Sequence, residues 1–356
     1  MPNTERGQRS LTYRYTRVFQ ELKSTTAREH EGGNMLRPED LYEEKSGMLS
    51  HPRIQGLPLL VSLEPPQDIG GTAYGVADVL RKELEHIKLA EFDFDQLCRY
   101  RERSLHSLFR KGLFNEMSLP EVNLYLMEDH LKQPFLLLAG AEPDYQWQRF
   151  VQAVLKIIRQ VKSSYVMLVS GYAMSFPHTR PIVVTIRGSY EELVAPLRTV
   201  NHVFEMHQSH TDFLEYMLAR QNIKTVKFNV HVPRYLGDNL LPQAVLRAME
   251  HITLVSKLSL PLEKLVVASG QAQRSINEMF KDNHEIAFLV KKFEEEYDKY
   301  MQHYPFNMLE LDIQENDSLL DREIIGQEIE KYLENLGERS SSDSSNADKP
   351  DSPRTS

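Results

Sequence analysis

Cysteine is nearly absent from the 356-residue chain, which contains Cys98 alone. A single cysteine excludes an intramolecular disulfide and any zinc site built from several cysteines. It is also typical of a reducing compartment, so we expect a cytoplasmic protein. Arg99 and Arg101 are basic neighbours of the kind that lower a thiol pKa, but the sequence identifies no histidine partner, and we do not expect Cys98 to be catalytic.

Long apolar runs are missing as well. The longest runs, such as residues 135–141, reach about a third of the ~20 residues that a membrane-spanning helix needs. Residues 1–33 are polar and charged and lack the apolar core of a secretory signal. We therefore expect neither a membrane segment nor secretion.

Positive charge is in deficit, because the chain has a formal net charge of −9. Residues 278–338 carry 17 acidic and 6 basic side chains, a net charge of −11, so the rest of the chain sums to about +2. No excess of basic residues is available to follow a phosphate backbone, and we expect no nucleic-acid binding. The acidic segment is instead a candidate surface for a protein partner.

Apolar runs alternate with segments in which apolar residues recur at helical spacing. The predicted strands cover residues 57–63, 123–127, 135–139, 165–170, 182–186 and 226–232, and the predicted helices cover residues 72–87, 211–220 and the stretch from Asp144 to Val161. This alternation predicts an α/β fold with a mostly parallel sheet flanked by helices.

Composition divides the chain into four parts. We predict a polar extension over residues 1–50, with one helix at 14–23, and an α/β domain over 51–240. An all-helical C-terminal section over 241–337, broken near 304–307, comes next. Residues 338–356, with seven serines, are predicted to be a disordered tail.

The first candidate site lies in residues 140–144, between a predicted strand and a predicted helix. Ligands of open α/β sheets bind beyond the carboxyl ends of the strands, and Glu142 and Asp144 are carboxylates suited to acid/base chemistry. The alternative is structural: Asp144 would cap the helix and Glu142 would accept hydrogen bonds from loop amides.

The second candidate site is the loop 177–181, where two prolines flank His178, Thr179 and Arg180. Histidine exchanges a proton near neutral pH, and arginine binds phosphate or carboxylate through two parallel hydrogen bonds. The alternative is that both side chains lock the loop.

Two further segments are weaker candidates for a binding site. The turn with Asp68, Gly70 and Gly71 lies before a predicted helix, where phosphate can bind, but it lacks the GxGxxG pattern and the lysine of a P-loop; a tight turn is the alternative. His207 and His210 have a spacing that can bind zinc, but no further ligand follows. We expect no metal site, and the sequence names no cofactor.

The same segments resemble the proteasome assembly chaperone 2 family, in particular its actinobacterial branch. The main matching segments are residues 136–144, followed by Trp147 and Phe150, and residues 177–181. The resemblance implies a sheet like that of nucleoside phosphorylases, a helical C-terminal part and self-association. Eukaryotic relatives act as chaperones in building the proteasome core particle, whereas the bacterial branch has no established activity to carry over. The chain departs from the family pattern at residues 65–67 and 206–210.

Two functions remain open. The first is a non-catalytic interaction or assembly module whose acidic helices bind a protein partner. The alternative is a pocket enzyme for a small anionic or nucleoside-like substrate. In that enzyme His178 would be the acid/base, Arg180 the anion clamp and Glu142 an orienting group. The residues expected to line its ligand site are Arg180, Thr179, Asp68, Gly70 and Trp147.

Overall fold

The computed structural model describes residues 36–45, 47–102, 107–110, 113–117, 119–194, 209–237, 239–281 and 284–303. Nearly all of them belong to one compact unit that begins at Pro38. The predictions for residues 1–35 and 304–356, including the helix at 14–23 and the disordered tail, lie outside the described residues. Within the described ranges, no helix is long and apolar enough to span a membrane.

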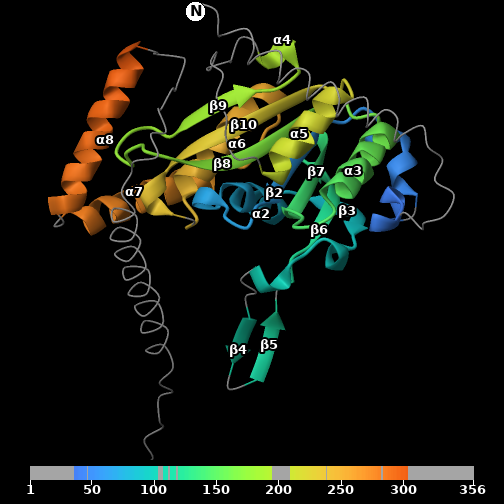
Figure 1. Ribbon diagram of the computed structural model, residues 1–356. Helices are drawn as coiled ribbons and strands as arrows, with labels where there is room; N and C mark the ends of the chain where they lie inside the picture. The colour runs from blue at the N-terminus through green and yellow to red at the C-terminus, as the bar shows by residue number, and fades with distance from the viewer. Residues whose placement is uncertain are drawn as a thin grey trace, which may run out of the picture. The chain divides into compact units, whose positions relative to one another are not determined.

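Eight strands form a single mixed sheet in the order β1–β3–β6–β7–β2–β8–β10–β9 (Figure 1). Its strands are β1 (Tyr42–Glu44), β2 (Leu59–Glu64), β3 (His86–Phe92), β6 (Val122–Glu128), β7 (Pro134–Ala141), β8 (Val166–Met174), β9 (Val183–Arg187) and β10 (Thr225–Pro233). A separate two-stranded hairpin consists of β4 (Ser107–Arg110) and β5 (Leu113–Met117).

The strand directions differ between the centre and the edges of the sheet. Strands β7, β2, β8 and β10 are parallel, whereas the pairs β1–β3, β3–β6, β6–β7 and β9–β10 are antiparallel. The prediction of a mostly parallel sheet therefore describes only the centre. A short turn, not a helix, joins β6 to β7, and in it the Asp129 carboxylate accepts hydrogen bonds from the backbone N–H groups of Leu131 and Gln133, both at 2.8 Å.

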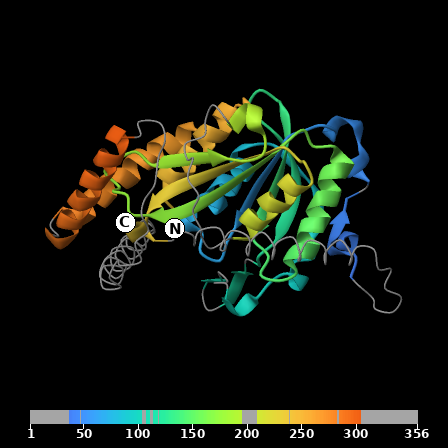
Figure 2. The ribbon, with the colours of Figure 1, turned by 45° about the horizontal axis from the view of Figure 1, so that its top comes forward.

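Helices cover both faces of the sheet (Figures 1 and 2). Successive residues of a strand point to opposite faces. Met167 thus belongs to the core beneath one pair of helices and Leu168 to the core beneath the other. The first pair is α2 (Thr72–Glu83) and α6 (Pro242–Ser256), and the second is α3 (Trp147–Val161) and α5 (His210–Arg220).

One helix is shorter than the sequence predicts. The expected helix over residues 72–87 ends at Glu83, and residues 86–92 form the unpredicted strand β3. Leu84 has the extended angles φ −115° and ψ 148°. Ile87, which continued the helical spacing, is 54% exposed on the strand. The apolar spacing therefore extended beyond the end of the helix by chance.

The described chain after β10 is helical. Helix α6 is followed by α7 (Glu263–Phe280) and α8 (His284–His303), and α4 (Glu191–Val194) is a single short turn before α5. Ile276 of α7 and Val290 of α8 are buried in the same apolar cluster as α6. At the other end, Leu41 and Leu49 are fully buried, so the described part of residues 1–50 contributes to the core.

Candidate functional site

The carboxyl ends of β2, β7, β8 and β10 meet at one edge of the sheet, because these four strands are parallel. The segments that follow three of them carry the predicted site residues, which are Asp68 and Gly70 after β2, Glu142, Asp144 and Trp147 after β7, and His178, Thr179 and Arg180 after β8. The structure gives these three groups different partners.

His178 is held by the chain that surrounds it. Its backbone N–H donates to the Tyr235 hydroxyl oxygen at 2.6 Å, and the same hydroxyl lies 2.6 Å from His178 Nδ1. The Gln273 amide donates to the His178 carbonyl at 3.0 Å. Burial lowers the pKa of His178 to about 4, so the imidazole is neutral at pH 7. These contacts fix the loop, as the structural alternative predicted.

Arg180 binds two carboxylates of α8. Its Nε donates to Asp298 at 2.8 Å, Nη2 to the same carboxylate at 2.5 Å, and Nη1 to Glu294 at 3.1 Å. Thr179 also donates to Glu294. The hydrogen bond from Arg180 lowers the pKa of Asp298, while the two carboxylates raise that of Arg180. The guanidinium predicted to clamp an anion therefore already binds anions of its own chain.

A cavity of about 470 Å³ opens between this loop, α6 and α7. Three of the predicted residues line it, His178, Thr179 and Arg180, together with side chains that the sequence did not single out. Its volume falls within the ~300–1,000 Å³ usual for ligand pockets. The other five predicted residues are not among its lining residues.

Asp68 and Gly70 build the turn from β2 into α2. The Asp68 carboxylate accepts hydrogen bonds from the backbone N–H groups of Ala73 at 3.1 Å and Tyr74 at 2.7 Å. Burial raises the pKa of Asp68 to about 7, because its effect is larger than that of the two amide hydrogen bonds, which lower the pKa. Gly70 has φ 67°, and a Cβ there would lie 3.1 Å from Val232. Both residues therefore have a structural role in this turn.

The residues after β7 also have structural partners. Glu142 is buried and accepts hydrogen bonds from the Thr211 backbone N–H, at 3.0 Å, and from its hydroxyl. Burial raises the pKa of Glu142. Trp147 donates from its indole to the Pro143 carbonyl at 2.8 Å. Its ring also meets the buried His210 edge-on, at 5.3 Å between centroids.

The predicted helix cap was wrong. Asp144 accepts a hydrogen bond from the Arg99 backbone N–H at 2.7 Å, and the N-cap of α3 is Gln146. Two intervening residues place the Asp144 side chain away from the first turn of the helix. The carboxylate instead binds Arg99, while the backbone N–H of Asp144 donates to the Leu97 carbonyl at 2.8 Å, so both groups fasten residues 97–99 to the segment before α3.

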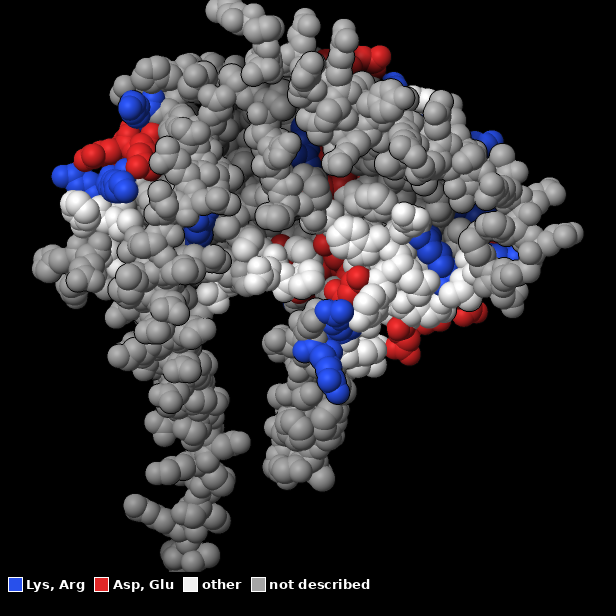
Figure 3. Space-filling model, viewed as in Figure 1, with Lys and Arg blue, Asp and Glu red and all other residues white. Residues whose placement is uncertain are grey.

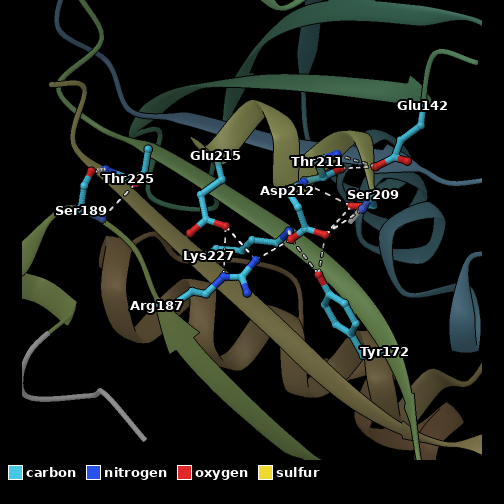
Figure 4. Close-up of polar contacts among 10 residues, drawn as sticks. All are labelled: Glu142, Tyr172, Arg187, Ser189, Ser209, Thr211, Asp212, Glu215, Thr225 and Lys227. Atoms are coloured by element: carbon cyan, nitrogen blue, oxygen red, sulfur yellow. Dashed lines mark hydrogen bonds and ion pairs between the residues drawn. The ribbon is translucent and has the colours of Figure 1, made fainter. Parts of the chain in front are cut away.

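A cluster of charged residues under α5 was missed by the sequence analysis (Figure 4). Lys227 of β10 is completely buried and pairs with Asp212 of α5. Arg187 of β9 binds the same carboxylate at 2.5 Å and Glu215 at 2.9 Å. Tyr172 donates to Asp212 at 2.9 Å. Burial opposes ionisation of Asp212, but the attraction of Lys227 and Arg187 holds its pKa well below the usual range.

The sequence did carry a signal for this cluster. Polar residues alternate with apolar ones along β10, where Lys227, Asn229 and His231 share one face. A lysine inside a strand of a covered sheet requires a buried anion. Ser209 and Asp212 also form a capping box at the start of α5, a pattern that is readable from their spacing.

The remaining candidate residues are the histidines and the single cysteine. Among the residues with described positions, no group of three or more His, Cys, Asp or Glu side chains could hold a metal ion. His210 is buried in α5, and His207 lies outside the described residues. Cys98 is buried in the core beneath α3. The cavity beside His178 has room for a ligand.

These observations define a class: an α/β protein with a mixed eight-stranded sheet, whose candidate catalytic groups are bound by other parts of the same chain. The sequence matches the PAC2 family over residues 62–280, more than half of the chain. The protein therefore belongs to the PAC2 family, and the predicted resemblance is confirmed.

Solved structures agree with this assignment. A Mycobacterium tuberculosis protein of unknown function is 32% identical with a TM-score of 0.70, over 78% of this chain and 93% of that chain. A Corynebacterium glutamicum protein of unknown function is 27% identical with a TM-score of 0.69, over 74% and 99% of the two chains. A second M. tuberculosis protein, described as a proteasome-assembly chaperone homologue, shares the fold at 20% identity and a TM-score of 0.59, over 66% and 100%. No curated protein matches the sequence.

Proposed function

We propose that the protein is a non-catalytic, assembly-chaperone-like module that binds other proteins, with unassembled subunits of the proteasome core particle as the expected partners. The observation that carries this proposal is membership of the PAC2 family over residues 62–280. The fold shared with a proteasome-assembly chaperone homologue adds support. Family and fold together favour protein binding as the activity.

The alternative enzyme is not supported by the contacts in the site. Such an enzyme would need His178, Arg180 and Glu142 to act on one substrate. Instead Tyr235 binds the imidazole, α8 binds the guanidinium and Thr211 binds the carboxylate. Each group is thus occupied by a different part of the chain.

The acidic section 278–338 remains our proposed surface for the partner. In its described part, Glu294 and Asp298 face Arg180, whereas Glu295 is exposed and Phe288 is 74% exposed. On the face in Figure 3, described residues of both charge signs lie in small mixed groups. This mixture fits our expectation that nucleic acid is not the partner.

Other predictions extend this proposal. A cytoplasmic location, self-association, kinship with nucleoside phosphorylases and the division into residues 51–240 and 241–337 stay predictions. So do the ligand-binding roles of Asp68, Gly70 and Trp147, whose side chains or backbone have the structural partners described above.

The proposal is tested by mixing the full chain with purified, unassembled core-particle subunits from an actinobacterium and following complexes by native mass spectrometry. We expect a complex that persists in His178→Asn and is lost when residues 282–338 are deleted. If no complex forms with the full chain, the proposed function is wrong. If the deletion leaves the complex intact, the acidic section is not the binding surface.

A further inference from the structure

The solvent-facing side of α8 differs in charge from the acidic section to which the helix belongs. Ile286 and Tyr297 are buried and hold one side of the helix against the fold. On an adjoining side, Glu294 and Asp298 pair with Arg180. The described residues of α8 that are most open to solvent form its outer face, and they are Ala287, Phe288, Lys291, Lys292, Glu295 and Lys299.

This outer face combines positive charge with an aromatic side chain. Its three lysines and one glutamate give a net charge of +2, whereas residues 278–338 together sum to −11. Within the described part of the chain, Lys291 and Lys292 form no ion pair. Phe288 lies one helical turn before them and is 74% exposed, the highest fraction among the large apolar side chains that the structure describes. Exposed aromatic and basic side chains together favour binding of a segment that is both acidic and apolar.

The chain shortly after α8 has this composition. Residues 309–321, which lie outside the described residues, carry five acidic side chains and no basic one. Five leucine or isoleucine residues are interspersed among them. The segment is therefore complementary to the outer face of α8 in charge and also supplies apolar side chains for Phe288.

The segment is also close enough to reach this face. Helix α8 ends at His303, and at 1.5 Å per residue Phe288 lies ~22 Å back along the helix. An extended chain spans ~3.3 Å per residue, so about seven residues after His303 cover that distance. A short connection also keeps the segment at an effective concentration on the order of millimolar, which favours the bound form even when the contacts are weak.

We propose that residues 309–321 turn back along α8 and bind its outer face, with an aliphatic side chain against Phe288 and carboxylates beside Lys291 and Lys292. The occupant of this face in the free protein is then a segment of the same chain. This inference does not rest on the proposed function. A partner that used the same face would first displace the segment.

Carbodiimide coupling of the full chain tests the inference, because this reagent joins a lysine to a carboxylate only when the two groups are in contact. The coupled peptides are identified by mass spectrometry. Mixing the chain with an isotope-labelled copy shows whether each coupled pair comes from one molecule or from two. The test variant is Phe288→Ala, and the control is Leu254→Ala, which shortens another exposed apolar side chain, on α6.

We expect coupling within one molecule from Lys291 or Lys292 to carboxylates of residues 310–321, and none from Lys257, an exposed lysine directly after α6. The yield should fall severalfold in Phe288→Ala and stay unchanged in Leu254→Ala, since loss of one buried aromatic ring weakens the bound form about tenfold. The inference is overturned if these couplings are absent, if they join two molecules, if Lys257 couples equally well, or if Phe288→Ala leaves the yield unchanged. Capture of proteasome subunits by a chain that lacks these couplings would refute this inference alone.

Discussion

Two arginine–carboxylate clusters fix helices to the sheet, and they differ in exposure. Arg187 and Lys227 hold Asp212 under α5, where the Asp212 side chain is 1% exposed. Arg180 holds Asp298 on α8, where the carboxylate side chain is 47% exposed. The same pairing of arginine with aspartate therefore forms a buried contact beneath α5 and a solvent-exposed contact at α8.

This difference decides how much the ion pairs contribute to the attachment of each helix. A buried charge that loses its partner destabilises the fold strongly, because nothing replaces the lost solvation. An exposed ion pair contributes only ~0–1 kcal/mol, because water and salt screen it. We infer that buried charges contribute strongly to the attachment of α5, whereas α8 is held mainly by its buried apolar side chains, among them Ile286 and Val290, and little by its exposed ion pairs.

The largest effect is expected from Asp212→Ala. This change removes the carboxylate that pairs with the buried Lys227. We therefore expect the free energy of unfolding to fall by about 3–5 kcal/mol. Urea denaturation monitored by circular dichroism measures it. The double variant Asp212→Ala with Lys227→Met should recover part of this loss, because no buried charge remains at that position. A loss below ~1 kcal/mol in the single variant would show that the buried pair of Asp212 and Lys227 contributes no more than an exposed one.

Asp68 differs from both clusters, because it is a buried carboxyl group whose hydrogen-bond donors are backbone amides and not cations. An unfolded aspartate has a pKa of ~3.9, and burial raises the pKa of Asp68 to about 7. Between these pH values the folded state keeps a proton that the unfolded state has lost. The unfolding free energy should therefore fall as pH rises, by at most ~1.4 kcal/mol per pH unit.

Asp68→Asn should remove this slope, since an asparagine does not titrate. Urea unfolding of both proteins at intervals from pH 4.5 to 7.5 gives the two slopes, and their difference isolates Asp68 from other titrating groups. Equal slopes would mean that Asp68 has the same pKa in the folded and unfolded states.

The smallest effect on global stability is expected from Arg180→Gln, at ~0–1 kcal/mol. Locally the change should free α8, because it removes the hydrogen bonds to Glu294 and Asp298. Hydrogen exchange should then accelerate in α8 and stay unchanged in α5, and 1 M salt should act on the unmodified protein in the same direction. Unchanged exchange in α8 would show that its apolar contacts alone hold it.

The sequence predicted the local elements better than the contacts between them. Residues 135–139 were predicted as a strand because they are continuously apolar, and they lie within β7. The pairing of Arg180 with Asp298 joins residues 118 positions apart, which no local pattern specifies. Lys227 was overlooked because its strand was identified from the valines around it. The prediction that Asp144 caps a helix was wrong, because a cap depends on the residue at which the helix begins and the sequence did not define that residue.

The most direct test of the proposed function is hydrogen exchange of the full chain, alone and with unassembled proteasome core subunits. We expect slower exchange in α8, the described helix of the acidic section, when the subunits are present. Exchange in α5 and β10 should not change, because the buried cluster already holds them. Identical exchange with and without the subunits throughout the chain would show that the protein does not bind them.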